Sequence, residues 1–303
     1  MKLAVVDIGS NAIRLQIVKA FVDNNLVSFK KLEYLRFPLR LGNDVFKKGV
    51  ISVSVLDKFT KLMQTFKLLI DLYEVEGYRA VATSAMREAK NGEEVKTFIK
   101  NQIGLNIEII SGSEEAKILN KAIIPYLTDS KHIHIDVGGG STEINIFDKK
   151  KLVQSQSFDI GSVRKLEAEK RDKTLKEINK WIKAVSISAT ESIQGIGTGG
   201  NINKIFNIAN KKAGKAISLA ELKALKAYIA AFTIKERLSI LKMNPDRADV
   251  IVPAANIYIN ALNTIGADSI LVPKVGLKDG LVYELYEKIS QKDLSEIEFL
   301  EDF

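Results

Sequence analysis

Two segments of the chain repeat one pattern of strand, glycine-containing turn and strand. The first reads DIGSNAIRL from Asp7, and the second reads DVGGGSTEI from Asp136. Laying Asp136 on Asp7 also superposes Gly138 on Gly9. An internal repeat of this kind indicates a duplicated structural unit, so we expect the protein to fold as two related halves.

Strand-like and helix-like segments alternate along both halves. Short apolar runs predict strands at 3–6, 13–18, 79–82, 107–110, 133–135 and 143–147, and helical spacing predicts helices over 54–73, 93–103 and 114–124. Further helices are expected from about Thr174, Asn201, Ser218, Thr233 and Asp246 onward. This alternation favours an α/β architecture of mixed layers.

The length of 303 residues suggests two domains, with the boundary near Pro125. We expect domains over 1–125 and 126–303, and the last helix, about 285–303, is a candidate to pack back on the first domain. Cysteine is absent, no apolar run approaches a spanning length, and Asp7 interrupts the N-terminal apolar stretch. A cytoplasmic protein is expected. The net charge of +8 suits a polyanionic ligand, although solubility explains it equally well.

The turn from Gly138 through Gly139 and Gly140 to Ser141 carries the strongest chemical signal. Glycines directly after a strand let backbone N–H groups approach a ligand closely, and such a turn can hold phosphate oxygens. A tight hairpin with positive φ angles would also require glycine. The flanking acids Asp136 and Glu143 could hold Mg²⁺ through oxygen ligands, which favours the phosphate reading.

The first turn offers four polar groups within one hairpin, from Asp7, Ser10, Asn11 and Arg14. A guanidinium can form paired hydrogen bonds to a phosphate, although an isolated turn with a surface arginine is equally ordinary. A third glycine cluster, with Gly197, Thr198 and Gly199, leads into a helix, whose N-terminus can bind an anion. It lacks the Gly-Lys-Ser/Thr ending of a Walker A loop.

Two further segments combine a structural and a chemical explanation. Arg87 follows a predicted strand, where ligands gather in α/β sheets, but a lone arginine is more often an ion-pair partner. Ser113 is predicted to cap a helix whose first turn carries Glu114 and Glu115, and a carboxylate there could also deprotonate a water. His132 and His134 cannot form a zinc site alone, so we expect them on a partly exposed strand face.

Taken in order, the segments resemble the exopolyphosphatase and guanosine pentaphosphate phosphohydrolase (Ppx/GppA) family over nearly the whole chain. The matching segments are DIGSNAIRL, ATSAMREAKN, IISGSEEA, IDVGGGSTEI, FDIGSVRKLE, GIGTGGNINKI, and RADVIVPAA followed by GLKDGLVYEL. The resemblance implies two actin-like domains of the ribonuclease H-like, ASKHA superfamily type, with mixed sheets flanked by helices and an interdomain cleft.

The resemblance also implies roles for the residues singled out above. The catalytic carboxylate falls on Glu115, with Glu114 as the second choice. Asp136 and Glu143 are implied to assist Mg²⁺, or another divalent cation, and the substrate. The phosphate-binding set implied or suggested is Asp7, Ser10, Asn11, Arg14, Arg87, Gly138, Gly139, Gly140, Ser141, Gly197, Thr198 and Gly199.

The expected activity is exopolyphosphatase, which releases phosphate from the end of inorganic polyphosphate. Alternatives are hydrolysis of guanosine pentaphosphate, a non-catalytic regulator that binds alarmone or polyphosphate, and an ATP-dependent kinase of the same superfamily. The expected partners are therefore polyphosphate or guanosine pentaphosphate and a second copy in a homodimer, with no nucleic acid and no membrane. Asn201 stands where the family often has Thr or Ser, which weakens the expected phosphate contact there.

Overall fold

The computed structural model describes residues 1–23, 26–185, 193–212, 214–292 and 298–299. The chain divides into two compact units. The first unit joins residues 1–122 to residues 276–303, and the second unit is Ile123–Val275. The chain therefore leaves the first unit once and returns to it at its end.

The first unit is built on a sheet with strand order β12-β3-β2-β1-β4-β5. Its strands are β1 (Lys2–Ile8), β2 (Ile13–Asp23), β3 (Leu26–Phe37), β4 (Gly77–Ala82), β5 (Ile107–Ile109) and β12 (Glu298–Phe299). Strands β1, β2 and β3 are antiparallel, whereas β4 and β5 run parallel to β1. The sheet is thus mixed, with a parallel pair of strands at each edge.

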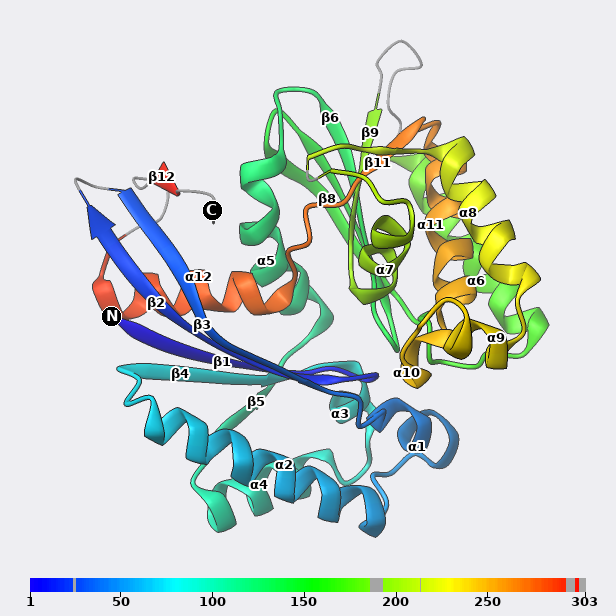
Figure 1. Ribbon diagram of the computed structural model, residues 1–303. Coiled ribbons are helices and arrows are strands. Elements are labelled where there is room, and N and C mark those ends of the chain that lie inside the picture. The colour runs from blue at the N-terminus through cyan, green and yellow to red at the C-terminus, as the bar shows by residue number, and fades with distance from the viewer. Residues whose placement is uncertain (24–25, 186–192, 213, 293–297, 300–303) are drawn as a thin grey trace. The chain divides into compact units, whose positions relative to one another are not determined.

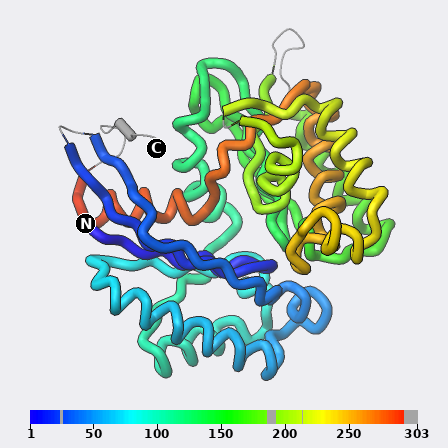
Figure 2. Tube along the Cα trace, viewed as in Figure 1, coloured from blue at the N-terminus to red at the C-terminus, as the bar shows by residue number. Residues whose placement is uncertain are grey.

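Helices cover both faces of this sheet, and alternate residues of β1 point to opposite sides. The helices are α1 (Leu41–Lys48), α2 (Val53–Leu72), α3 (Ser84–Glu88), α4 (Gly92–Ile103), α5 (Gly112–Ile123) and α12 (Leu277–Ser290). Val6 packs in one core with residues of α2 and α4, and Val5 packs in another with residues of α12. Figure 1 shows α2 and α4 on one side of the sheet and α12 on the other. Figure 2 shows the last helix running beside the first strand. This contact explains why the end of the chain belongs to the first unit.

The second unit repeats the plan with strand order β10-β11-β9-β6-β7-β8. Its strands are β6 (Lys131–Val137), β7 (Thr142–Asp148), β8 (Lys151–Phe158), β9 (Ile193–Thr198), β10 (Ile217–Ser218) and β11 (Ser269–Leu271). Its helices are η1 (Ile124–Tyr126), α6 (Ala168–Ala184), α7 (Gly200–Ile208), α8 (Leu219–Ala231), α9 (Ile234–Ser239), α10 (Pro245–Ala248) and α11 (Ile251–Ile265). Helices α6, α8 and α11 bury the face of β6 that carries Ile133 and Ile135.

The internal repeat is confirmed at the level of single residues. Asp7 pairs with Arg14 across the first hairpin, and Asp136 pairs with Glu143 at the same register of the second. In both sheets the first strand of the hairpin is the central strand that meets the parallel neighbour, β4 or β9. The predicted α/β fold of two mixed sheets flanked by helices is likewise confirmed.

Two local predictions are wrong. Ser113 was expected to cap this helix, but the helix begins at Gly112, and the hydroxyl of Ser111 accepts the N–H of Glu114. His132 and His134 are fully buried rather than partly exposed. Their register partners on the neighbouring strands are Phe147 and Ile196. These two residues form a core cluster with Ile123 and Leu127, which flank η1, and this cluster covers the histidine face of the sheet.

Candidate functional site

The turn of the first hairpin places a guanidinium against a carboxylate. Arg14 Nη1 donates to Asp7 Oδ2 at 2.5 Å, directly across the antiparallel pair. The Asp7 side chain is 8% exposed and that of Arg14 is 23% exposed. The carboxylate is therefore held inside while part of the guanidinium stays accessible to an anion.

Neighbouring segments hold the turn itself in place. The carbonyl of Ser10 accepts from the N–H of Gly42 at 2.8 Å, and that of Asn11 accepts from Arg40 at 3.1 Å. The Ser10 hydroxyl lies 2.7 Å from that of Ser84, the first residue of α3, and both side chains are buried. Ser84 was not among the predicted site residues, although it stands in the quoted ATSAMREAKN segment.

Arg87 and Glu115 lie together, on helices that follow β4 and β5. Arg87 Nη1 donates to the carbonyl of Ile110 at 2.7 Å and lies 3.8 Å from Glu115 Oε2. The Glu115 side chain is only 12% exposed. Both residues sit just beyond the carboxyl ends of parallel strands, the edge where α/β sheets bind ligands. The structure thus brings two predicted site residues into one charged pair.

Glu114 belongs to a different network. Its carboxylate lies 3.1 Å from Arg79 Nη2, and the same guanidinium contacts Glu108 at 2.9 Å and Glu284 at 2.5 Å. Burial opposes the charge of Arg79, but these acidic partners raise its pKa above the ordinary value. The Glu114 side chain is 45% exposed. Glu114 therefore belongs to a structural ion-pair cluster. The geometry favours Glu115 over Glu114 as the candidate base.

The turn of the second hairpin has two acids at the equivalent register. Asp136 Oδ1 accepts from the Thr198 hydroxyl at 2.6 Å, and Glu143 Oε1 accepts from the Ser157 hydroxyl at 3.0 Å. Glu143 is 1% exposed. Each carboxylate thus has a neutral hydroxyl donor from an adjacent strand of the sheet.

Hydrogen bonds to the carbonyl groups of the glycine turn hold it against residues 162–164. The carbonyl of Gly138 accepts from Ser162 N at 3.0 Å, that of Gly139 from Val163 N at 2.8 Å, and that of Gly140 from Arg164 Nε at 2.6 Å. The N–H of Gly138 donates to the carbonyl of Ser141 at 3.0 Å, which leaves the N–H groups of Gly139 and Gly140 to consider. Within the described residues, no hydrogen bond uses the N–H of Gly139 or Gly140.

Gly161 explains why the segment FDIGSVRKLE accompanies the glycine turn. A Cβ at Gly161 would lie 2.5 Å from the carbonyl oxygen of Gly139, closer than real Cβ atoms come. Only glycine lets these two stretches of backbone meet. Sequence reasoning gave no role to Gly161, Ser162 or Arg164, and the recurrence of the segment in the family resemblance was the signal that could have found them.

In the third glycine cluster, some residues serve packing and others lie at the candidate site. Gly197 lies inside β9, where a Cβ would meet Ile270 at 2.6 Å, so close packing accounts for it. Gly199 has φ 106° and precedes α7. A Cβ there would lie 3.2 Å from Asp136 Oδ1. The structure therefore brings Thr198 and Gly199, but not Gly197, to the acid.

Tyr258 of α11 forms hydrogen bonds with the ends of both β6 and β9. Its hydroxyl accepts from the N–H of Val137 at 3.2 Å and donates to the carbonyl of Thr198. Complete burial, together with the charge of Asp136, raises the pKa of this phenol well above its ordinary value. Tyr258 therefore remains a neutral donor, and the sequence gave no sign of this role.

The donors present fit a weakly held hard cation. No group of three or more His, Cys, Asp or Glu side chains able to hold a metal occurs in the part of the chain that is described. Asp136 and Glu143 supply hard oxygen donors on paired strands. Mg²⁺ typically takes one or two carboxylates and completes its shell with water and substrate phosphates, so this donor set suits it.

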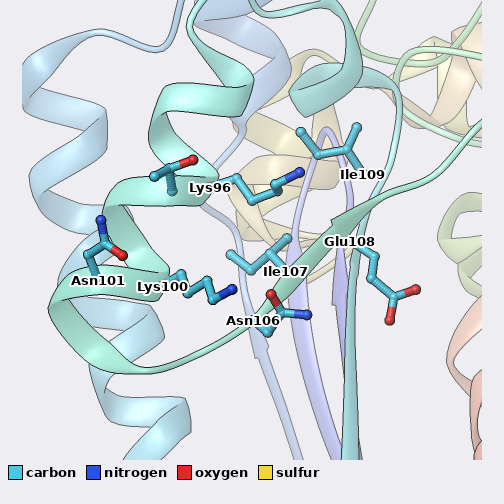
Figure 3. Close-up of a pocket in the computed structure, with 8 residues that line it drawn as sticks. Lys96, Lys100, Asn101, Asn106, Ile107, Glu108 and Ile109 are labelled. Carbon is cyan, nitrogen blue, oxygen red and sulfur yellow. The ribbon is translucent and has the colours of Figure 1, made fainter.

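Two pockets lie apart from these residues. One, of about 570 Å³, runs between α4 and β5 and is lined by Lys96, Lys100 and Asn106 among others (Figure 3). The other, of about 340 Å³, is lined by Arg79, Glu108 and Glu284 among others. Neither pocket is lined by a predicted catalytic or phosphate-binding residue. No helix among the described residues has the length and apolar character needed to cross a membrane.

The duplicated mixed sheets, each with a polar turn after its central strand, define an α/β protein in which one plan is used twice. A family model described as the Ppx/GppA phosphatase family matches residues 20–289. The chain belongs to this family.

Individual relatives agree with the family assignment. A guanosine-5'-triphosphate,3'-diphosphate pyrophosphatase from Photobacterium profundum is 25% identical over 97% of this chain and 61% of its own length. Exopolyphosphatase 1 from Mycobacterium leprae is 21% identical, over 93% and 88%. The crystal structure of an exopolyphosphatase from Cytophaga hutchinsonii superposes with a TM-score of 0.83 at 24% identity, covering 95% of this chain and 98% of the other. The chain spans 47% and 61% of the length of the first curated relatives that it matches.

Proposed function

We propose that the chain hydrolyses the terminal phosphoanhydride of inorganic polyphosphate and releases phosphate. The observation that carries the proposal is the pair of Glu115 and Arg87, 3.8 Å apart beyond the carboxyl ends of β4 and β5. A buried carboxylate beside a guanidinium combines a proton acceptor with a phosphate-binding group. Reactions of this class depend on positioning and on charge stabilisation, and the pair offers both.

Within the first unit, the proposal assigns the base and several phosphate-binding groups. Glu115 takes a proton from water as the water oxygen bonds to the terminal phosphorus. The bond from that phosphorus to the bridging oxygen breaks, and its electrons stay with the shortened chain. Arg87 and Arg14 bind the phosphate oxygens, with the Ser10 and Asn11 turn as further donors. The accessible part of the Arg14 guanidinium supports its role.

Within the second unit, the proposal assigns backbone donors to phosphate oxygens and the two acids to a cation. The N–H groups of Gly139 and Gly140 are available because no hydrogen bond among the described residues uses them. Asp136 and Glu143 would hold Mg²⁺, which supplies positive charge against the phosphate oxygens when bound. Thr198 fixes the orientation of Asp136.

Guanosine pentaphosphate is the second candidate substrate. The relative from Photobacterium profundum, 25% identical, is named for hydrolysis of that nucleotide. The bond broken would again be a terminal phosphoanhydride. Polyphosphate is preferred because the net charge of +8 suits a long polyanion, which gains more from a positive surface than a single nucleotide does. A cytoplasmic location and a homodimer remain predictions.

The test follows phosphate release from polyphosphate, guanosine pentaphosphate and ATP side by side with Mg²⁺. Glu115→Gln is expected to lower kcat by roughly 10²–10⁴-fold, because it removes the base and keeps the shape. Glu114→Gln is the matched control and should retain kcat near the parent value. Full activity of Glu115→Gln would remove Glu115 from the mechanism. Tight binding of all substrates without turnover by the parent chain would favour a regulator over an enzyme.

A further inference from the structure

A line of buried polar side chains stands behind Asp136. Asn145 Nδ2 lies 3.0 Å from His134 Nδ1, and His134 Nε2 lies 2.9 Å from the Thr198 hydroxyl. That hydroxyl in turn lies 2.6 Å from Asp136 Oδ1. Asn145, His134 and Thr198 are fully buried, so bulk water does not compete for these contacts.

The charge of Asp136 fixes the direction of every bond in this line. An ionised carboxylate only accepts, so the single hydroxyl proton of Thr198 must point to Asp136. The Thr198 oxygen is then left to accept, which requires the proton of His134 to be on Nε2. His134 Nδ1 consequently accepts from the amide of Asn145. One tautomer of a neutral imidazole satisfies the whole line.

The first hairpin lacks this line at the equivalent positions. There the register partners are Val5 and Gln16 where the second hairpin pairs His134 with Asn145. Gln16 donates instead to Asp279, at 3.3 Å. The line is therefore an addition to the second hairpin and not a requirement of the shared fold.

We propose that His134 is a positioning residue that acts through Thr198 to hold the carboxylate of Asp136 in the orientation used for the divalent cation. The role in cation binding rests on the function proposed above. Partners of a ligating carboxylate typically change metal affinity by about 10–100-fold when removed. The His134 ring is fully buried, and both of its nitrogens are used, Nε2 with Thr198 and Nδ1 with Asn145.

The tautomer can be tested without any activity measurement. The chain has only two histidines, so long-range ¹H–¹⁵N spectra contain only two imidazoles, and a His132→Gln variant assigns them. We expect His134 to show a protonated Nε2 and an unprotonated Nδ1 at pH 7. A protonated Nδ1 would overturn the proposal, because Thr198 could then no longer receive a hydrogen bond from the ring.

The effect on Asp136 is tested by metal binding. His134→Leu removes the donor, whereas His134→Gln keeps an amide N–H at about the reach of Nε2. We expect Mn²⁺ binding, followed by electron paramagnetic resonance, to weaken by about 10–100-fold in His134→Leu and to recover in His134→Gln. His132→Leu is the matched control, since His132 is equally buried on the same strand but contacts Ser130 and Thr128.

The outcomes separate this inference from the proposed function. Unchanged Mn²⁺ affinity in a folded His134→Leu variant would overturn the positioning role even if polyphosphate is hydrolysed. Failure of the parent chain to hydrolyse any substrate, with the Mn²⁺ affinity still dependent on His134, would overturn the proposed function alone. Equal weakening in His132→Leu and His134→Leu would indicate a general loss of packing and would also contradict the proposal.

Discussion

The two central hairpins share a backbone and differ in charge. In the first, Asp7 faces Arg14, and the two side chains form an ion pair at 2.5 Å. In the second, the same register places Asp136 opposite Glu143, and hydroxyl donors on adjacent strands hold both acids. One hairpin therefore offers a cation to an anionic ligand, and the other offers two anions to a cation.

Under the proposed function, this difference would give the two copies of the repeat different roles in hydrolysis. Phosphoryl transfer needs positive groups against the phosphate oxygens and carboxylates to hold the metal that neutralises them. The repeat supplies two copies of one geometry that differ at one register position, Arg14 or Glu143, and the proposed function assigns phosphate to the first copy and the cation to the second.

The largest expected effect comes from giving the first hairpin the charge of the second. Arg14→Glu would place two carboxylates face to face at a site where Asp7 is 8% exposed, and it would remove a phosphate-binding cation. We expect a loss of about 2–5 kcal/mol in transition-state binding, roughly 30-fold to several-thousand-fold in kcat/KM for polyphosphate. Steady-state kinetics on variants with native circular dichroism measures it.

Two companion variants sharpen this prediction. Arg14→Lys keeps the charge and loses the paired donors, so its effect should be smaller than that of Arg14→Glu. Glu143→Gln, at the equivalent register, should raise the Mg²⁺ concentration for half-maximal activity more than it raises KM for polyphosphate. A variant Arg14→Glu with the parent kcat/KM would contradict the assignment of the first hairpin to phosphate.

The segments that hold the two turns differ in rigidity, and alanine substitution tests the difference. A Cβ at Gly161 would meet backbone atoms of Gly139 and Gly140, whereas a Cβ at Gly42 would meet mainly the ring of Phe46, which can rotate. We expect Gly161→Ala to lower the free energy of unfolding by about 1–3 kcal/mol and Gly42→Ala to lower it by less. Urea denaturation of both variants measures this, and equal losses would contradict the comparison.

The fold was predictable because its signals are local and repeated. The apolar spacing of residues 54–73 gave a helix that the structure confirms as Val53–Leu72, and Gly104 ends α4 as expected, with φ 75°. Strands β3 and β8 were missed. Both carry many exposed residues and lie away from the centre of their sheets, so neither has the apolar run that marks a buried strand.

The site was predictable only in part, because its supporting residues act through contacts between distant segments. Arg87 and Glu115 were found from the family segments, and the structure brings them within 3.8 Å. Tyr258 could not be found, since its role depends on a helix that folds back on the turn. His134 was expected on a partly exposed face because the sequence does not show which residues cover it.

The Tyr258 hydroxyl bonds to β6 and to its parallel neighbour β9, where the first strand of the second hairpin ends. Tyr258→Phe would leave the N–H of Val137 and the carbonyl of Thr198 without this hydroxyl in a buried place. We expect a loss of about 1–3 kcal/mol in the free energy of unfolding, with little change in the ring packing. Urea denaturation measures it. A stability equal to that of the parent chain would show that the hydroxyl does not hold the strands together.

The smallest expected effect is the pH dependence contributed by His134, which stands where the first hairpin has Val5. Burial lowers the pKa of His134 from 6.5 to about 3, so between these values the unfolded chain binds a proton that the folded chain does not. Stability should therefore fall as the pH decreases from 6.5 toward 3, by about 1.4 kcal/mol per pH unit from this residue. Metal-free unfolding of the parent and of His134→Gln at pH 7.5 and 5.5 isolates the contribution. Equal pH slopes in the two proteins would show that His134 gains its proton in the folded state, and the contrast with the uncharged Val5 would then disappear.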